Sequence, residues 1–258
     1  MGLIKALPVF LLAAALLSYA APAAAVVYQY FDEEGTLIVT DNPHRTKRSH
    51  TASSVLVPSV RTESGDGITY EYYPVTGRTF SEAVAAASGL GPFDGKEGRP
   101  YAGQTRWSAG WSYAFRSSCR KEGGLLRVSL QLTDIDFKSR LTVVLPSLAG
   151  GVSLGRHDSS LWEKFMKGLR EHEADHVAII RDPAYRDEAV RRLSSLRELV
   201  VPADPSGAPD DVIRQAVEAE TARIGHEILK KIKARNDEYD RITEHGIKHE
   251  MRSAFFDR

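Results

Sequence analysis

The pattern of apolar residues changes part-way along the chain, and this change constrains the fold more than any other feature. Between Ile68 and Leu145 apolar residues tend to alternate with polar ones, most clearly at 126–132, which is typical of strands with one buried face. After Pro146 they recur every three or four positions, which predicts helices. Strands followed by helices favour an α+β fold, with an antiparallel sheet first and helices packed on it.

Turn and capping signals place several elements. We expect a strand at 68–73 and a short helix that begins after Thr79, in a capping box with Glu82, and ends at Gly89. A second strand begins at Trp107, and its alternate aromatic side chains predict a core face, with a ligand-binding platform as the alternative. After a break at 202–209, a long helix is expected from about 211 to 243.

Residues 172–176, His-Glu-Ala-Asp-His, fit the H-E-x-x-H pattern. His172 and His176 stand one helical turn apart on one face, so both imidazoles can reach a single Zn²⁺. Glu173 can take the proton of a water held on that metal. The apolar stripe that starts at Trp162 continues through both histidines to Ile180, so they face the core. Core histidines satisfied by hydrogen bonds are the alternative.

This helix has a signal at each end. Ser160 followed by Glu163 fits a capping box and predicts the start. Pro183 disfavours a helical residue before it, which predicts an end near Arg181.

A catalytic zinc site usually has three protein ligands and one water, so a third ligand is needed beyond the motif. The downstream candidates are Glu220, His226, Glu227 and His245. Glu227 and His245 are 18 residues apart, about 27 Å along an unbroken helix, so they cannot serve one metal together. Glu227 would complete a two-His, one-Glu set, and His245 would complete three imidazoles. A solvated histidine at a helix end is the alternative for His245.

Several blocks of the chain resemble the bacterial predicted secreted zinc-dependent peptidases, a family long catalogued as a domain of unknown function. The matching blocks are 72–79, 91–92, 105–107, 111–113, 162–176 and 239–246. The resemblance implies a zincin-like helix around the zinc motif and a peptidase domain at 68–258. It favours His245 as the third ligand, with Tyr239 as a catalytic residue and Asp240 lining or orienting the pocket.

The resemblance also implies a disulfide that this chain lacks. Family members are expected to pair a cysteine near Cys119 with one between the two late helices, where this chain has Val-Pro-Ala-Asp at 201–204. Cys119 is the single cysteine, so it is expected to be unpaired.

The first 25 residues read as a signal peptide. Lys5 supplies a positive charge, residues 9–17 are apolar, and 23–25 are three alanines that suit cleavage. The apolar stretch is too short for a stable membrane anchor. We therefore expect an exported protein, periplasmic or secreted.

A small β-hairpin is expected at 26–43. Strand patterns at 27–31 and 36–40 flank an Asp-Glu-Glu-Gly turn. The hairpin resembles a short N-terminal module common in exported proteobacterial proteins. The polar stretch at 44–67 then reads as a linker to the main domain.

The charges are balanced, with 34 basic and 34 acidic residues, which argues against a nucleic-acid partner. The sequence thus predicts an exported zinc-dependent metallopeptidase that acts on a peptide or protein through a zinc-bound water activated by Glu173. The alternative is a non-catalytic, zinc-containing envelope protein that binds partners or serves as a scaffold. A fourth imidazole on the metal, from His157 or His249, would favour that alternative.

Overall fold

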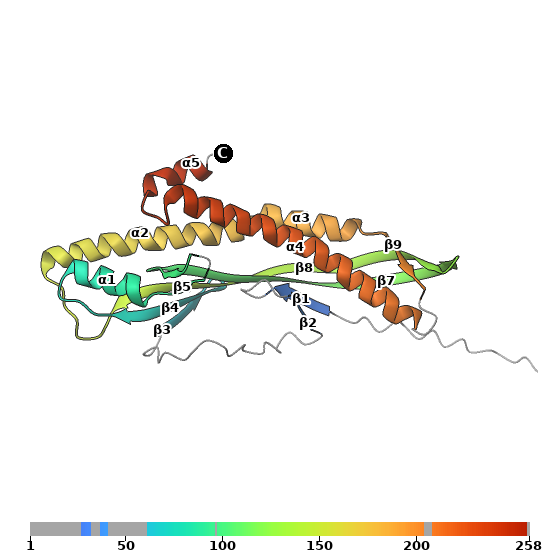
Figure 1. The fold of residues 1–258 in the computed structure, drawn as a ribbon, viewed down its shortest axis with the longest axis horizontal. Coiled ribbons are helices and arrows are strands. Elements are labelled where there is room, and N and C mark those ends of the chain that lie inside the picture. Colours follow the sequence, from blue (N-terminus) through green and yellow to red (C-terminus); the bar gives the residue numbers. More distant parts are fainter. Residues whose placement is uncertain (1–26, 32–36, 41–60, 96, 204–207, 257–258) are drawn as a thin grey trace, which may run out of the picture.

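The computed structural model describes residues 27–31, 37–40, 61–95, 97–203 and 208–256. The signal segment predicted at 1–25 and most of the linker predicted at 44–67 lie outside these ranges. Figure 1 shows a long sheet with the main helices on one of its faces. The strands are β1 (Val27–Phe31), β2 (Leu37–Thr40), β3 (Arg61–Gly65), β4 (Ile68–Val75), β5 (Phe93–Asp94), β6 (Arg99–Pro100), β7 (Gln104–Glu122), β8 (Leu125–Leu148) and β9 (Glu198–Pro202). The helices are α1 (Phe80–Leu90), α2 (Arg156–Ile180), α3 (Pro183–Ser195), α4 (Pro209–Thr243), the 3₁₀ turn η1 (His249–Met251) and α5 (Arg252–Phe256).

The main sheet has the strand order β2-β1-β7-β8-β4-β3, and β9 pairs with one end of β8. The predicted α+β class is confirmed, but the sheet is mixed and the prediction of an antiparallel sheet is wrong. β4 runs parallel to β8 from Ile68, opposite Leu141, to Val75, opposite Leu148. The long β7–β8 hairpin returns the chain in the same direction as β4. Strand direction cannot be read from alternation, because the alternation is the same in both directions.

The predicted N-terminal hairpin is present, but its first strand joins the main sheet. β1 pairs with β2 and also with β7, from Val27 opposite Tyr113 to Tyr30 opposite Gly110. A lone hairpin leaves unpaired backbone groups on both edges, and pairing with β7 satisfies one of them. The predicted linker is also shorter at its end, because β3 at Arg61–Gly65 pairs with β4.

The helix boundaries follow some of the predicted signals. Thr79 caps α1 by accepting a hydrogen bond from the Glu82 amide, as expected, although α1 continues past Gly89 to Leu90. α2 ends at Ile180, as Pro183 predicted. The capping box predicted at Ser160 is wrong, because α2 already begins at Arg156. Two elements, α3 and β9, were not expected from the sequence.

The core lies between the sheet and the helices. Trp111 and Tyr113 of β7 are almost fully buried, while Trp107 is half-buried, so most of the aromatic stripe forms core. α4 packs very closely here, because a Cβ built on its Gly225 would lie 1.9 Å from the Trp111 ring. Because Gly225 has no side chain, α4 can lie directly against the sheet. This close packing fixes the position of the C-terminal end of α4.

At one end of the sheet, β9 pairs with β8, and Val200 opposes Arg127.

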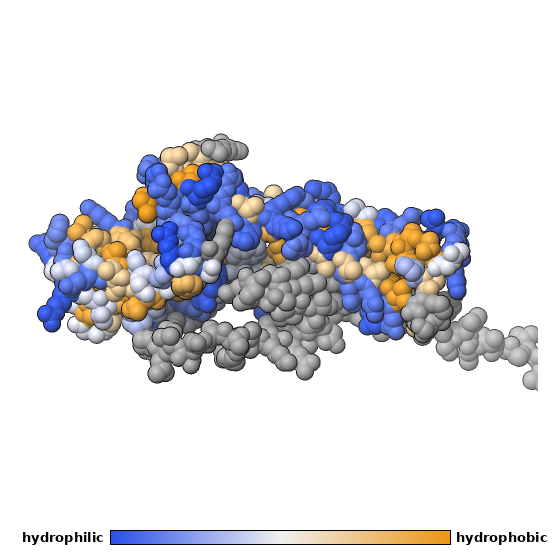
Figure 2. Space-filling view, viewed as in Figure 1, coloured by the Kyte–Doolittle hydropathy of each residue, from blue (hydrophilic) through white to orange (hydrophobic). Residues whose placement is uncertain are grey.

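Cys119 on β7 is exposed and free, as predicted. Figure 2 shows apolar surface gathered towards this end, where Leu125 and Val200 are exposed. Within the described ranges, the helices lack a stretch long and apolar enough to cross a bilayer.

Candidate metal centre

α2 carries His172, Glu173 and His176, and all three residues are buried, with 4%, 3% and 8% of their surface exposed. The two imidazoles meet edge to face, and their Nε2 atoms are 3.1 Å apart. This is the geometry expected of residues at i and i+4 on one helix face. Both rings point inward, towards α4.

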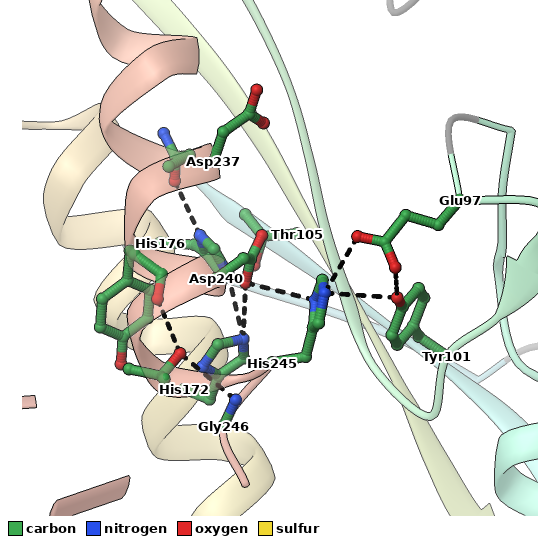
Figure 3. A network of polar contacts seen from close by, with 12 residues as sticks. Glu97, Tyr101, Thr105, His172, His176, Asp237, Asp240, His245 and Gly246 are labelled. Atoms are coloured by element: carbon green, nitrogen blue, oxygen red, sulfur yellow. Dashed lines mark hydrogen bonds and ion pairs between the residues drawn. The ribbon is translucent and has the colours of Figure 1, made fainter. Parts of the chain in front are cut away.

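α4 supplies a carboxylate to the same point. Asp240 Oδ1 lies 3.2 Å from His172 Nε2 and 3.0 Å from His176 Nε2 (Figure 3). Tetrahedral zinc, with bonds of about 2.0–2.1 Å to N and O ligands, holds its ligand atoms about 3.3 Å apart. The three donor atoms therefore already stand at nearly the separations that one such ion requires. This group could hold a metal ion.

The outer nitrogen of His176 is held by α4. Its Nδ1 lies 2.7 Å from Asn236 Oδ1, and the Asn236 amide donates to the Ile232 carbonyl at 2.9 Å. That second bond leaves the Asn236 oxygen facing the imidazole, so His176 donates from Nδ1 and turns Nε2 towards His172 and Asp240. Metal-binding histidines are commonly oriented in this way by an outer partner.

His172 is positioned by packing. Its ring stacks on Tyr239 with centroids 5.1 Å apart, and its Nδ1 has no hydrogen-bond partner among the described residues. Gly246 closes the other side, where a Cβ would come within 3.2 Å of His172 Nδ1. Gly246 has a φ of 83°, a conformation that favours glycine.

Glu173 is buried beside the start of β7. Thr105 Oγ1 donates to Glu173 Oε2 at 2.7 Å. A Cβ on Gly103 would lie 2.7 Å from Glu173 Oε1, so the absence of a side chain at Gly103 makes room for the carboxylate. Burial raises the pKa of Glu173 above its ordinary value, although the neighbouring His176 and His172 oppose this. A raised pKa suits a group that accepts and returns a proton near neutral pH.

The pKa of Asp240 is shifted in the opposite direction to that of Glu173. Burial alone would raise its pKa, but the hydrogen bonds from His172 and His176 outweigh burial and lower the pKa below its ordinary value. Asp240 is therefore an anionic ligand candidate, whereas the proton-accepting role predicted for Glu173 stays a prediction.

His245 lies at the edge of this group. Its Nδ1 is 3.6 Å from Asp240 Oδ1, and its Nε2 is 3.0 Å from Glu97 Oε1 and 3.3 Å from the Tyr101 hydroxyl (Figure 3). Glu244 and His245 both have left-handed backbones, with φ of 48° and 54°. The turn after α4 thus directs His245 between Asp240 and the β5–β6 hairpin. The ligand role predicted for His245 stays a prediction.

The other predicted ligand candidates lie far from the group formed by His172, His176 and Asp240. Glu220, His226 and Glu227 precede Asp240 on α4 by 13 residues or more, which is about 20 Å of helix. Glu227 pairs with Arg192 and Arg223, and Glu220 pairs with Arg223. They do not join the group of His172 and His176.

Tyr239 is nearly fully buried behind the imidazoles. Its hydroxyl donates to Asp175 Oδ2 at 2.5 Å, and Arg252 Nε and Nη2 bind the same carboxylate at 2.6 and 2.7 Å. Burial and the neighbouring Asp175 raise the pKa of the Tyr239 hydroxyl. These contacts suit a residue that supports His172, and the catalytic role predicted for Tyr239 stays a prediction.

Comparison with known families accounts for most of the chain. The family described as "Bacterial protein of unknown function (DUF922)" matches residues 70–246. The chain belongs to this family. A second family, "Domain of unknown function (DUF4124)", matches residues 14–63, which include the β1–β2 hairpin. No curated protein and no solved structure matches the chain.

The DUF922 region contains the residues described at the centre except Arg252, and several of their roles were not predicted from the sequence. Asp240 was expected to line or orient the pocket and not to bind the metal, and Asn236 was not considered. Asn236 and Asp240 are four residues apart on one helix face, so this spacing was an available signal. Thr105 and Glu97 offered no such signal, because their positions depend on contacts between distant segments.

Replacing Asn236 by Ala should weaken zinc binding about 10- to 100-fold, as losses of such outer partners commonly do. His176 would lose the bond that fixes its tautomer, while its own ligand atom would remain. Competition with a chromogenic chelator measures the change. Glu227→Ala, on the same helix about 20 Å from Asp240, is the control and should leave the affinity unchanged. Equal affinities for the two variants would contradict the orienting role of Asn236.

Proposed function

We propose that this protein is an exported zinc-dependent metallopeptidase that hydrolyses peptide bonds. The observation that carries the proposal is the convergence of three donor atoms, from His172, His176 and Asp240, beside the buried Glu173. Catalytic zinc sites typically use three protein ligands and keep one position for water or substrate. Two imidazoles and one carboxylate are a common ligand set of that kind.

The residues divide into three roles. His172, His176 and Asp240 would hold the metal, and Asn236 keeps His176 in the tautomer that can bind it. Zinc, when bound, supplies Lewis acidity and a water of lowered pKa. Glu173 takes a proton as the water oxygen attacks the peptide carbonyl, and it passes this proton to the amine that leaves. Thr105 holds the Glu173 carboxylate in place for both steps.

The resemblance to predicted secreted zinc-dependent peptidases supports the same function, because α2 carries the His-Glu-x-x-His motif on which that resemblance partly rests. In this proposal α2 would serve as a zincin-like helix. Export is proposed from the charged, apolar and alanine-rich segments within residues 1–25.

A non-catalytic envelope protein that keeps zinc for structure is the second candidate. Structural zinc sites are normally closed by four protein ligands. His157 precedes His172 by 15 residues on α2, about 22 Å of helix, which is too far to be a fourth ligand. Within the described ranges, the metal-capable group has three members. This favours an open, catalytic position over a closed structural one.

Metal analysis and a cleavage assay test the proposal together. The purified mature protein should carry about one zinc per chain and cleave members of a diverse peptide library. The double variant His172→Ala, His176→Ala should lose both the zinc and the cleavage. Stoichiometric zinc retained by that variant would refute the site. Wild-type protein that binds zinc but cleaves nothing would support the second candidate.

A further inference from the structure

The two imidazoles of the metal centre are held in different ways. His176 donates to Asn236, whereas His172 Nδ1 has no hydrogen-bond partner among the described residues. On the side away from its Nε2, the His172 ring is therefore held by packing, between Gly246 and the stacked ring of Tyr239. Whatever fixes the Tyr239 ring thus also fixes the direction in which His172 presents Nε2.

The C-terminal segment packs against the Tyr239 ring. Phe255 of α5 is fully buried and meets Tyr239 edge to face, with ring centroids 5.0 Å apart, and Phe256 lies 5.7 Å from the same ring. Arg235 of α4 holds Phe255 in turn. Its guanidinium carbon lies 3.7 Å from the centre of the Phe255 ring, and its Nη2 donates to the Phe255 carbonyl at 3.0 Å. Figure 1 shows α5 lying over the C-terminal end of α4.

Arg252, the first residue of α5, ties the same tyrosine to α2. Its guanidinium donates two hydrogen bonds to the Asp175 carboxylate, which also accepts a hydrogen bond from the Tyr239 hydroxyl. Asp175 is only 2% exposed, and an ionised carboxylate is costly to bury unless a charged partner compensates it. Arg252 therefore keeps in place the carboxylate that holds the Tyr239 hydroxyl.

We propose that α5 is a positioning element of the metal centre, in which Arg252 and Phe255 orient His172 through Tyr239. α5 lies beyond residue 246, where the match to the DUF922 family ends. The inference rests on the proposed zinc site and adds to it residues that act through Tyr239 and not on the metal. Loosening α5 should disturb His172 more than His176, because Asn236 holds His176 independently.

Arg252→Gln tests the proposal in the full-length protein. The amide supplies neither the charge nor both hydrogen bonds to Asp175, so the Tyr239 ring should be less firmly fixed. Zinc affinity, measured by competition with a chromogenic chelator, should fall about 10- to 100-fold, as it commonly does when an outer partner of a metal ligand is lost. Arg252→Lys keeps the charge but not the two-pronged contact, and should retain part of the affinity. A folded Arg252→Gln protein with wild-type zinc affinity would overturn the proposal.

Arg192→Gln is the matched control for a general loss of stability. Arg192 also pairs with two carboxylates, those of Glu188 and Glu227. Glu227 precedes Tyr239 by 12 residues on α4, which is about 18 Å of helix. The control should bind zinc as the wild-type protein does. An equal loss of affinity in Arg192→Gln and Arg252→Gln would reduce the role of α5 to general stability and overturn the proposal.

The NMR signals of the imidazole rings give a readout that needs no metal. In zinc-free Arg252→Gln protein, the ring protons of His172 should shift further from their wild-type positions than those of His176. Phe255→Ala should produce the same asymmetry, because it removes the packing behind Tyr239. Equal shifts of the two rings, or no shift in a folded variant, would refute the proposed route from α5 to His172.

The two proposals can fail separately. A wild-type protein that binds no zinc would remove the peptidase, and the ring signals of the zinc-free protein would still decide the role of α5. Wild-type zinc binding together with equal shifts of the two rings would keep the metal site and remove the role of α5.

Discussion

Replacing Glu173 by Gln should abolish peptide hydrolysis while the protein keeps its zinc and its fold. The amide has the shape of the carboxylate but cannot accept a proton, so the base proposed for the reaction is lost. General acid–base groups typically contribute about 10²–10⁴-fold to the rate, and we expect a loss of at least that order.

The surroundings of Glu173 support this choice of variant. The side chain is buried and close to Gly103, so a shorter or bulkier replacement would disturb the packing. Thr105 donates to Glu173 Oε2, and the amide oxygen of Gln can accept the same bond. Zinc content by elemental analysis and thermal unfolding are the matched readouts, and both should be near wild type.

The outcomes of this experiment distinguish Glu173 as the base from two other cases, in which another group is the base or Glu173 supports the metal. A rate left unchanged by Glu173→Gln would mean that another group accepts the proton. Loss of zinc together with activity would mean that Glu173 supports the metal centre itself. A control is Glu171→Gln on the same helix, which leaves the proposed base untouched and should leave the rate within a few-fold of wild type.

Asp240→Asn should weaken zinc binding at least about 100-fold, because it removes the carboxylate of the candidate ligand group. Losing an outer partner commonly costs 10- to 100-fold in metal affinity, and a direct ligand should cost no less. Asn keeps the size of the side chain, so the packing between α2 and α4 should survive. Chelator competition at fixed pH gives the affinities.

Two variants make this result interpretable. Asp237→Asn changes a carboxylate on the same helix that pairs with the exposed Lys233, and its zinc affinity should be unchanged. His245→Ala tests the ligand role predicted from the sequence. If His245→Ala weakens zinc binding more than Asp240→Asn does, then His245 is the third ligand and Asp240 orients the histidines.

Parts of the site that lie within one element were predictable. The four-residue spacing of His172 and His176, with Glu173 beside them, places all three on one helix, and Pro183 marks its end. The alternation at 126–132 likewise identified a strand with one buried face. These features depend only on local periodicity, which the chain carries regardless of its partners.

Parts that depend on how elements meet were not predictable. Parallel pairing of β4 with β8 needs the whole β7–β8 hairpin, and the pairing of β1 with β7 joins residues that are 80 or more positions apart. The identity of the third ligand could not be settled from the sequence either, because it depends on how α4 meets α2. Proximity along α4 could exclude pairs of candidates but could not say which of them faced α2.

The sequence by itself therefore determined the helix that carries the two imidazoles and the candidate base. Only the tertiary structure decided that Asp240, 64 residues beyond His176, completes the group. The position of Asp240 beside the histidines depends on how α4 crosses the sheet, where Gly225 lets the helix pack directly on Trp111. A helix periodicity specifies which side chains share a face, whereas the packing of that face against others specifies which side chains meet.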